Sequence, residues 1–361
     1  MLLVINAGSS SIKLALFDAA LNAQARAQVG EIAEGGHAAA LQDGLRQAGV
    51  ALDHLTAVAH RVVHGGAGLI APCRVNPSVL AAIDACVPLA PLHNPANLMG
   101  IRAVADLAPD LPQYVSFDTA FHATNPDVAT RYAIPAADAA LGIRRYGFHG
   151  LSYAALVQAL PKLSGAPLPK RLLALHLGNG ASLCAILDGQ SVATTMGYSP
   201  LDGLTMGTRA GGIDGNAVLR LAEVHGIDGA TRILNRESGL LALGGASDMR
   251  ELHDSGTAQA RFAVDHFSYW AVRHAGGMIA AMGGLDAIAF TGGIGENDAE
   301  VRARIMDGLA WAGVTYDNDA NHKGSACLHD TGSRVAIWTV PAQEERQIAS
   351  EALALMGVGS E

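Results

Sequence analysis

The hydrophobic pattern of residues 172–188 predicts a strand, a loop and a returning strand. An apolar run, 172–175, stops at a polar, glycine-rich stretch, 176–182, and a second apolar run, 183–187, ends at the turn dipeptide Asp188-Gly189. Short apolar runs bounded by turn residues are typical of buried strands. Asn179 lies between two glycines, whose bare backbone N–H groups can face a phosphate.

The same pattern occurs 170 residues earlier, at 2–18. A gapless alignment places Leu2 on Leu172 and Asp18 on Asp188. Taken alone, the first loop also fits an ordinary serine-rich β-turn. The repetition instead predicts a duplicated unit, with two phosphate loops that bind one nucleotide in the cleft between two domains.

The remaining pattern alternates between helices and strands, which favours an α/β fold. At 361 residues the chain is long enough for two domains with separate cores. Apolar runs at 57–63, 114–117, 287–291 and 334–340 predict strands. Apolar and polar residues at helical spacing predict helices at 38–48, 77–87, 98–108, 152–160, 216–225 and 299–310.

Charge and cysteine content exclude several functional classes. The formal net charge of −9 argues against nucleic acid or an anionic membrane as a partner. The four cysteines have no CxxC spacing, so neither a zinc cluster nor a redox pair is expected. No apolar run approaches the roughly 20 residues of a membrane span, and residues 1–6 lack the features of a signal peptide. We therefore expect a soluble, reduced, cytoplasmic protein.

Four residues stand out as candidates for anion chemistry. Arg61 lies in a predicted strand with no acidic residue within several positions, which favours an anionic ligand over a local salt bridge. Asp118 follows the strand 114–117, at the end where functional side chains collect, although it could also cap a helix. His149 precedes a predicted helix, and Arg209 lies in a long glycine-rich loop that can approach a ligand.

Two further segments are informative. His93 is presented from a loop stiffened by two prolines, where a purely structural histidine is the alternative. The glycine loop 291–297 joins a strand to a helix and suits the ribose or α-phosphate of a nucleotide. The chain lacks both GxGxxG and GxxxxGK[ST], which disfavours a Rossmann dinucleotide site and a P-loop.

Eight motifs together resemble the acetate kinase family, a branch of the acetate and sugar kinase/Hsc70/actin superfamily; they are 6–13, 60–66, 91–95, 117–122, 145–150, 176–182, 206–209 and 290–297. The resemblance implies two duplicated ribonuclease H-like (actin-like ATPase) domains, at 1–121 plus 346–361 and at 122–345, the second with most of the nucleotide site. It also implies reversible phosphorylation of acetate by ATP, giving acetyl phosphate and ADP, with Mg²⁺ or Mn²⁺, in a homodimer.

The resemblance assigns roles to individual residues. The implied catalytic residues are Arg61, Asp118, His149 and Arg209, of which His149 and Arg209 stabilise the transition state. Asn6 and Glu344 are implied metal ligands. The implied nucleotide-binding residues are Ser9, Ser11, Lys13, His176, Leu177, Gly178, Asn179, Gly180, Asp248, Met249, Arg250, Gly293, Ile294, Gly295, Glu296 and Asn297. The implied acetate-binding residues are Arg61, Val63, Leu92, His93, Phe148 and Pro200.

The expected chemistry is direct in-line transfer. A carboxylate is already a nucleophile at neutral pH, so the protein must mainly bring two anions together and neutralise the phosphoryl oxygens. The chain departs from the family pattern at Gly212, where an acidic residue is missing, and in the altered segment 342–346. A propionate or butyrate kinase is the first alternative, because one methylene changes discrimination by only ~1–3 kcal/mol. A non-transferring ATPase switch is the second, but it needs no carboxylate-binding arginines.

Overall fold

The computed structural model describes residues 1–8, 10–33 and 35–358, and they form two compact units. The first unit contains Met1–Ala123, Gly150–Ala155 and Gln343–Glu361; the second contains Thr124–His149 and Leu156–Ala342. The sequence-based boundaries put 150–155 in the second domain. These residues are counted in the first unit, where Leu151 packs in a core formed by β1, β4 and the C-terminal helix.

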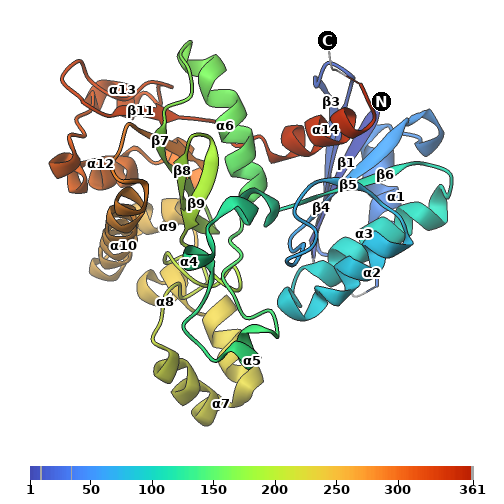
Figure 1. Cartoon of the computed structure of the whole chain (residues 1–361), viewed down its shortest axis with the longest axis horizontal. Coiled ribbons are helices and arrows are strands. Elements are labelled where there is room, and N and C mark those ends of the chain that lie inside the picture. Colours follow the sequence, from blue (N-terminus) through green and yellow to red (C-terminus); the bar gives the residue numbers. More distant parts are fainter. Residues whose placement is uncertain (9, 34, 359–361) are drawn as a thin grey trace. The chain divides into compact units, whose positions relative to one another are not determined.

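The first unit is built on a six-stranded sheet of order β3-β2-β1-β4-β6-β5 (Figure 1). Its strands are β1 (Leu2–Ala7), β2 (Ile12–Phe17), β3 (Ala23–Val29), β4 (Ala57–Val62), β5 (Cys73–Arg74) and β6 (Gln113–Phe117). Side chains alternate between the two faces: Leu3 and Ile5 pack on one side, whereas Leu2 and Val4 pack on the other.

Helices cover both faces of this sheet. The helices α1 (His37–Ala48) and α3 (Asn94–Leu107) pack on the face of Leu3 and Ile5, and α2 (Pro77–Ala85) packs against α3. The C-terminal helix α14 (Glu344–Leu355) packs on the face of Leu2 and Val4. Buried on both sides, β1 is therefore apolar at nearly every position.

The second unit has a five-stranded sheet of order β11-β10-β7-β8-β9. Its strands are β7 (Arg171–Leu177), β8 (Ala181–Leu187), β9 (Gln190–Thr194), β10 (Ala287–Thr291) and β11 (Ala336–Thr339). Its helices are α4 (Asp127–Thr130), α5 (Ala136–Ala139), α7 (Gly215–Arg236), α8 (Gly239–Gly244), α9 (Met249–Ser255), α10 (Ala258–Met282), α11 (Gly292–Asn297), α12 (Ala299–Gly308) and α13 (Asn318–His322), and α6 (Gly150–Ser164) enters it from the first unit. The long helix α10 packs along β7, β8 and β9.

The two sheets repeat one arrangement, as the duplicated sequence pattern predicted. The order β3-β2-β1-β4-β6 in the first unit corresponds to β9-β8-β7-β10-β11 in the second, with the same parallel and antiparallel pairings. Within the described residues, no helix is long and apolar enough to cross a membrane.

The gapless alignment of the two hairpins is wrong in the second strand. Leu2 pairs with Phe17, but Leu172 pairs with Ile186 rather than Leu187. Four residues, 8–11, connect the first pair of strands and three, 178–180, connect the second. The first loop therefore contains one additional residue, and apolar residues at both offsets hid this shift in the sequence.

Candidate functional site

In the first unit, Arg61 and Asp118 form a bidentate ion pair. Since β4 and β6 are adjacent and parallel, Arg61 near the end of β4 lies beside Asp118, the residue after β6. Arg61 Nε donates to Asp118 Oδ1 at 2.9 Å, and Nη2 donates to Oδ2 at 2.5 Å. The sequence argument considered only a local salt bridge, and it missed this ion pair because the partner is 57 residues away along the chain.

Burial and charge act in opposite directions on this pair. Burial raises the pKa of the Asp118 carboxyl, and the facing Arg61 guanidinium opposes that shift. Burial alone lowers the pKa of Arg61, but the charges of Asp118 and Glu344 more than compensate and raise it. We consider both groups ionised at neutral pH, because the two charge-assisted hydrogen bonds favour the charged forms.

Oxygen atoms from two other elements complete this cluster. Asn6, in β1, places its Oδ1 atom 3.4 Å from Arg61 Nη1. Glu344 is the first residue of α14, and its charge acts on both Arg61 and Asp118. In the part of the chain that the structure describes, no three His, Cys, Asp or Glu side chains converge as a metal site.

Two buried asparagines that the sequence reasoning missed hold the chain after β4. Asn97 Oδ1 accepts the Val63 amide at 3.0 Å, and Asn97 Nδ2 donates to the Ala7 carbonyl at 2.6 Å. Asn94 exchanges hydrogen bonds with the backbone of His64. Both asparagines lie in or directly after the proline-containing segment 91–95, from which Leu92 and His93 were selected. Their position beside these prolines could have marked them as candidates in the sequence. Val63 is buried, His93 half-buried and Leu92 exposed.

In the second unit, His149 is held in a left-handed conformation with φ of 58°. It caps α6 by position, its Nδ1 atom lies 2.9 Å from Ser182 Oγ, and its ring stacks on His176 with centroids 4.1 Å apart. A positive φ is costly for a residue other than glycine, which indicates that the surrounding contacts fix this imidazole. The preceding Phe148 is buried.

Arg209 differs from Arg61 in its partners. Its Nη1 atom donates to the Pro200 carbonyl at 2.5 Å. Among the described residues it forms no ion pair with a carboxylate, and burial lowers its pKa to about 10. At neutral pH the guanidinium is still charged, so a charge that the protein itself leaves uncompensated is held in a largely desolvated position.

Glycines allow the backbone to approach these side chains. A Cβ atom on Gly180 would lie 2.7 Å from Arg209 Nη2 and 3.1 Å from His149 Nε2. A Cβ atom on Gly207 would lie 1.9 Å from Asn179 Oδ1. The glycines beside Asn179 and Arg209 are therefore required by close packing, and Arg209 and His149 meet at Gly180.

A pocket of about 740 Å³ lies in the second unit. Eight residues selected from the sequence line it: Gly178, Asn179, Asp248, Met249, Arg250, Gly293, Ile294 and Asn297. Gly178 and Gly293 follow the adjacent parallel strands β7 and β10, so their backbones lie at the same edge of the sheet. Asp248 caps α9 and binds Arg250, whose hydrogen bonds lower the pKa of that carboxyl to about 2.

Comparison with known proteins places this arrangement in a family. The sequence model of the Acetokinase family matches residues 24–350. The chain belongs to the acetokinase family. It is 43% identical to the acetate kinase of Rhodopseudomonas palustris, over 97% of this chain and 96% of the relative, and 42% identical to that of Streptomyces avermitilis, over 98% and 97%.

Solved structures confirm the acetokinase fold. Porphyromonas gingivalis acetate kinase has a TM-score of 0.90 at 33% identity, over 98% of this chain and 99% of that one. A propionate kinase from Francisella tularensis has a TM-score of 0.90 at 34% identity, over 97% and 98%. The predicted family and fold class are thus confirmed. Because both kinds of kinase match equally well, the backbone does not distinguish acetate from propionate.

The other nucleotide-binding candidates selected from the sequence lie outside the pocket lining. Leu177 and Gly295 are buried, His176 contacts His149, and Gly180 contacts Arg209. Glu296 Oε1 accepts the backbone N–H groups of Gly292 and Ala342. In the first unit, Ser11 is half-buried and Lys13 is exposed, and Ser9 lies outside the described residues.

Five lining residues were missed: Ser247, His253, Asp254, Asp298 and Ala299. Two of them carried a usable signal. Asp298 directly follows the glycine loop and precedes a helix, which is the pattern of an N-cap, and it does accept the Val301 amide at 2.9 Å. His253 lies one helical turn after Met249 and Arg250 and therefore shares their side of α9.

Proposed function

We propose that this protein is an acetate kinase, which transfers the γ-phosphoryl group of ATP to acetate and catalyses the reverse reaction with acetyl phosphate and ADP. The observation that carries the proposal is Arg209: a half-buried, charged guanidinium without a carboxylate partner among the described residues, in contact with the same glycine as His149. A phosphoryl group in transfer carries the negative charge that such a site lacks.

Arg61 is the proposed binding residue for the acceptor. A guanidinium has five N–H donors, and Asp118 takes two of them. Among the residues that the structure describes, the Nη1 atom has only a long contact with Asn6, so it can bind a carboxylate of the substrate. Asp118 would orient Arg61, because its carboxylate is buried and fixes the guanidinium plane. Val63, Leu92, His93, Phe148 and Pro200 remain the proposed lining for the methyl group.

Arg209 and His149 are the proposed groups that stabilise the transition state. Both are fixed in place, Arg209 by the Pro200 carbonyl and His149 by Ser182 and the His176 ring. The acceptor carboxylate is itself a nucleophile, so positioning and charge neutralisation are sufficient for direct in-line transfer without a phospho-enzyme.

The pocket in the second unit is the proposed nucleotide site. Backbone N–H groups of the glycine segments near Gly178 and Gly293 suit phosphates, and the α9 side suits the nucleoside. Ser9, Ser11 and Lys13 of the first unit would contribute on the phosphate side. His176, Leu177, Gly180, Gly295 and Glu296 would support the loops from outside the lining.

Magnesium fits the oxygen atoms of the first unit. Mg²⁺ is commonly held by one or two carboxylates together with substrate phosphates, and Asn6 and Glu344 supply a carbonyl oxygen and a carboxylate near Asp118. A bound ion would neutralise charge on the phosphate oxygens. Without the ion, Asn6 contacts Arg61 and the charge of Glu344 acts on it.

We also propose a homodimer in the cytoplasm. The second unit exposes large apolar side chains on α10 and α7, with Phe262 at 56%, Tyr269 at 64% and Ile227 at 78% exposure. Such surfaces support self-association. All four cysteines are free thiols, which agrees with a reducing compartment. Light scattering during gel filtration measures the assembly directly.

Trapping of acyl phosphates with hydroxylamine tests the activity. The protein is incubated with Mg-ATP and each of formate, acetate, propionate and butyrate. We expect the highest kcat/KM with acetate. A higher value with propionate would support the second candidate, for which the Francisella tularensis neighbour is the specific observation. ATP hydrolysis without any acyl phosphate would contradict both.

A further inference from the structure

The nucleotide pocket has two chemically different ends. One end consists of the glycine segments at Gly178 and Gly293, where the backbone carries no side chain and a ligand can approach it closely. The other carries three carboxylates, Asp248, Asp254 and Asp298. Phosphates are disfavoured beside carboxylates, whereas ribose hydroxyls and amino groups of a base can donate hydrogen bonds to them.

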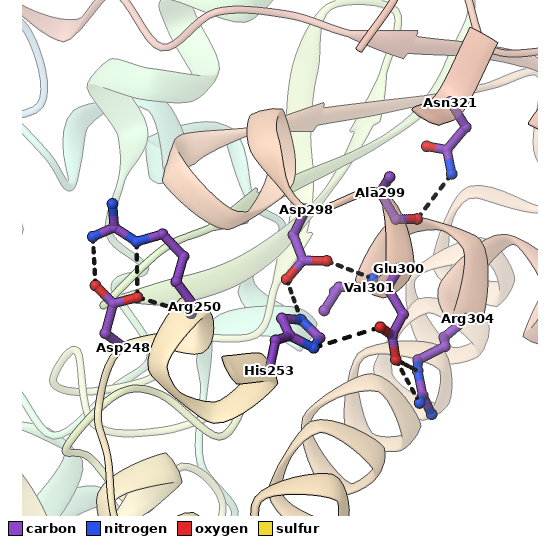
Figure 2. A network of polar contacts seen from close by, with 9 residues as sticks. All are labelled: Asp248, Arg250, His253, Asp298, Ala299, Glu300, Val301, Arg304 and Asn321. Carbon is purple, nitrogen blue, oxygen red and sulfur yellow. Dashed lines mark hydrogen bonds and ion pairs between the residues drawn. The ribbon is translucent and has the colours of Figure 1, made fainter. Parts of the chain in front are cut away.

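His253 connects two walls of this acidic end. It lies on α9, and its Nε2 atom is 2.8 Å from Asp298 Oδ2, at the junction of α11 and α12 (Figure 2). Its Nδ1 atom is 3.5 Å from Glu300 Oε2. The side chains of His253 and Asp298 are 27% and 13% exposed, so the contact is partly shielded from water.

Both partners of His253 are themselves held in place. Asp298 uses its other oxygen to cap α12 through the Val301 amide. Glu300 binds Arg304 at 2.7 Å, and Arg304 also binds Asp265 on α10. Figure 2 shows His253 directed toward Asp298 and Glu300, with the Asp248–Arg250 pair on the other side. The chain of contacts therefore fixes α9 against α12 and α10.

We propose that the His253–Asp298 bridge is a positioning element for the nucleoside part of the nucleotide. It fixes the separation of the two walls between which the ribose and base bind. His253 acts on nucleotide affinity and does not take part in transfer, because Arg209 and His149 are placed by other contacts. The inference rests on the proposed function, since it takes the pocket to be a nucleotide site.

Three variants of the full chain separate this role from a general structural one. His253→Ala removes both ring contacts. His253→Gln retains an N–H donor that can reach Asp298 in place of Nε2. His54→Ala is the matched control, because His54 and Asp53 form a distant surface pair, 4.0 Å apart, with side chains 81% and 80% exposed.

Calorimetric titration with ADP and steady-state kinetics provide the readouts. We expect His253→Ala to raise the Kd for ADP and the KM for ATP about tenfold, while kcat and the KM for acetate stay within twofold. His253→Gln should stay within about threefold of the unaltered protein, and His54→Ala should match it. If His253→Ala does not fold, His253→Asn replaces it, because its amide is too short to reach Asp298.

An unchanged Kd for ADP in the folded His253→Ala variant would overturn the inference. So would a fall in kcat as large as the rise in the KM for ATP, because the bridge would then control the reacting phosphates. Failure of the proposed function gives a different result: the unaltered protein would bind no ADP or form no acyl phosphate. ADP binding requires no turnover, so the two failures are distinguishable.

Discussion

Arg61 lies near the end of β4 and Arg209 in the loop between β9 and α7, and the charges of these two arginines are compensated differently. Arg61 is neutralised by the buried carboxylate of Asp118 at 2.5 Å. Arg209 has a carbonyl as its hydrogen-bond partner and, among the described residues, no ion pair. The first charge is compensated when the protein folds, whereas the second is compensated only when an anion binds. We therefore expect Arg61 to contribute to both stability and catalysis, and Arg209 to favour catalysis at some cost in stability.

The largest expected effect is that of Arg209→Met on turnover. Loss of one preorganised charge contact to the transition state lowers kcat by about 1000-fold. The same variant should raise stability, because it removes a partly desolvated charge that has no ionised partner among the described residues. Turnover is measured by hydroxamate trapping and stability by urea unfolding. A loss of stability in Arg209→Met would contradict the expectation that Arg209, unlike Arg61, destabilises the folded protein.

Arg61→Ala should lower kcat by about 100-fold and also destabilise the protein. It leaves the Asp118 carboxylate buried without its partner, and breaking such a pair costs about 3 kcal/mol. The double variant Arg61→Ala/Asp118→Ala should recover most of the stability but none of the activity. Equal stability of the single and double variants would show that Asp118 does not depend on Arg61.

A smaller effect is expected from Gly180→Ala. The added Cβ atom would lie 2.7 Å from Arg209 Nη2 and 3.1 Å from His149 Nε2, so the Arg209 guanidinium must shift and the His149 ring must move by a few tenths of an ångström. Since these atoms are the ends of side chains, the melting temperature should change little, while kcat falls about tenfold. Gly189→Ala, in the turn after the same hairpin, is a control for strain, because that glycine has a φ of 80° and lies away from both side chains.

The contrast between the arginines also marks the limit of the sequence reasoning. The strands, the duplicated hairpin and the glycine loops could be predicted from the sequence, because each depends on a pattern of residues that are close together along the chain. The pairing of Arg61 with Asp118 depends on β4 and β6 lying side by side, which local patterns do not specify. His253 was missed for a related reason: its partner Asp298 is 45 residues away, and a single histidine carries little information. The two glycine loops of the nucleotide site were found from their local pattern, whereas 248–250 were found only through the family resemblance.

The smallest predicted effect is a pH dependence that belongs to Arg209 alone. Its pKa is lowered to about 10 by burial, so in the free protein the guanidinium loses its proton as the pH rises through about 10. The pKa of Arg61 is raised, so that group stays charged throughout. Below pH 10 both the folded and the unfolded chain carry the Arg209 charge, and the full cost of burying it is present. Between about 10 and its ordinary value of 12.5 the unfolded chain binds more protons, so this cost to stability decreases as the pH rises.

The ionisation of Arg209 should affect kcat/KM and kcat at different pH values, because the first quantity depends on the free protein and the second on the complex with substrate. The value of kcat/KM reports ionisation in the free protein and should fall above about pH 10. Bound ATP places negative charge beside Arg209, which raises its pKa, and kcat should therefore decline only at a higher pH. Since alkaline unfolding would lower both quantities together, far-UV circular dichroism at each pH identifies the usable range. Coincident declines of kcat and kcat/KM within that range would mean that the nucleotide does not compensate the Arg209 charge, and the distinction between the two arginines would be lost.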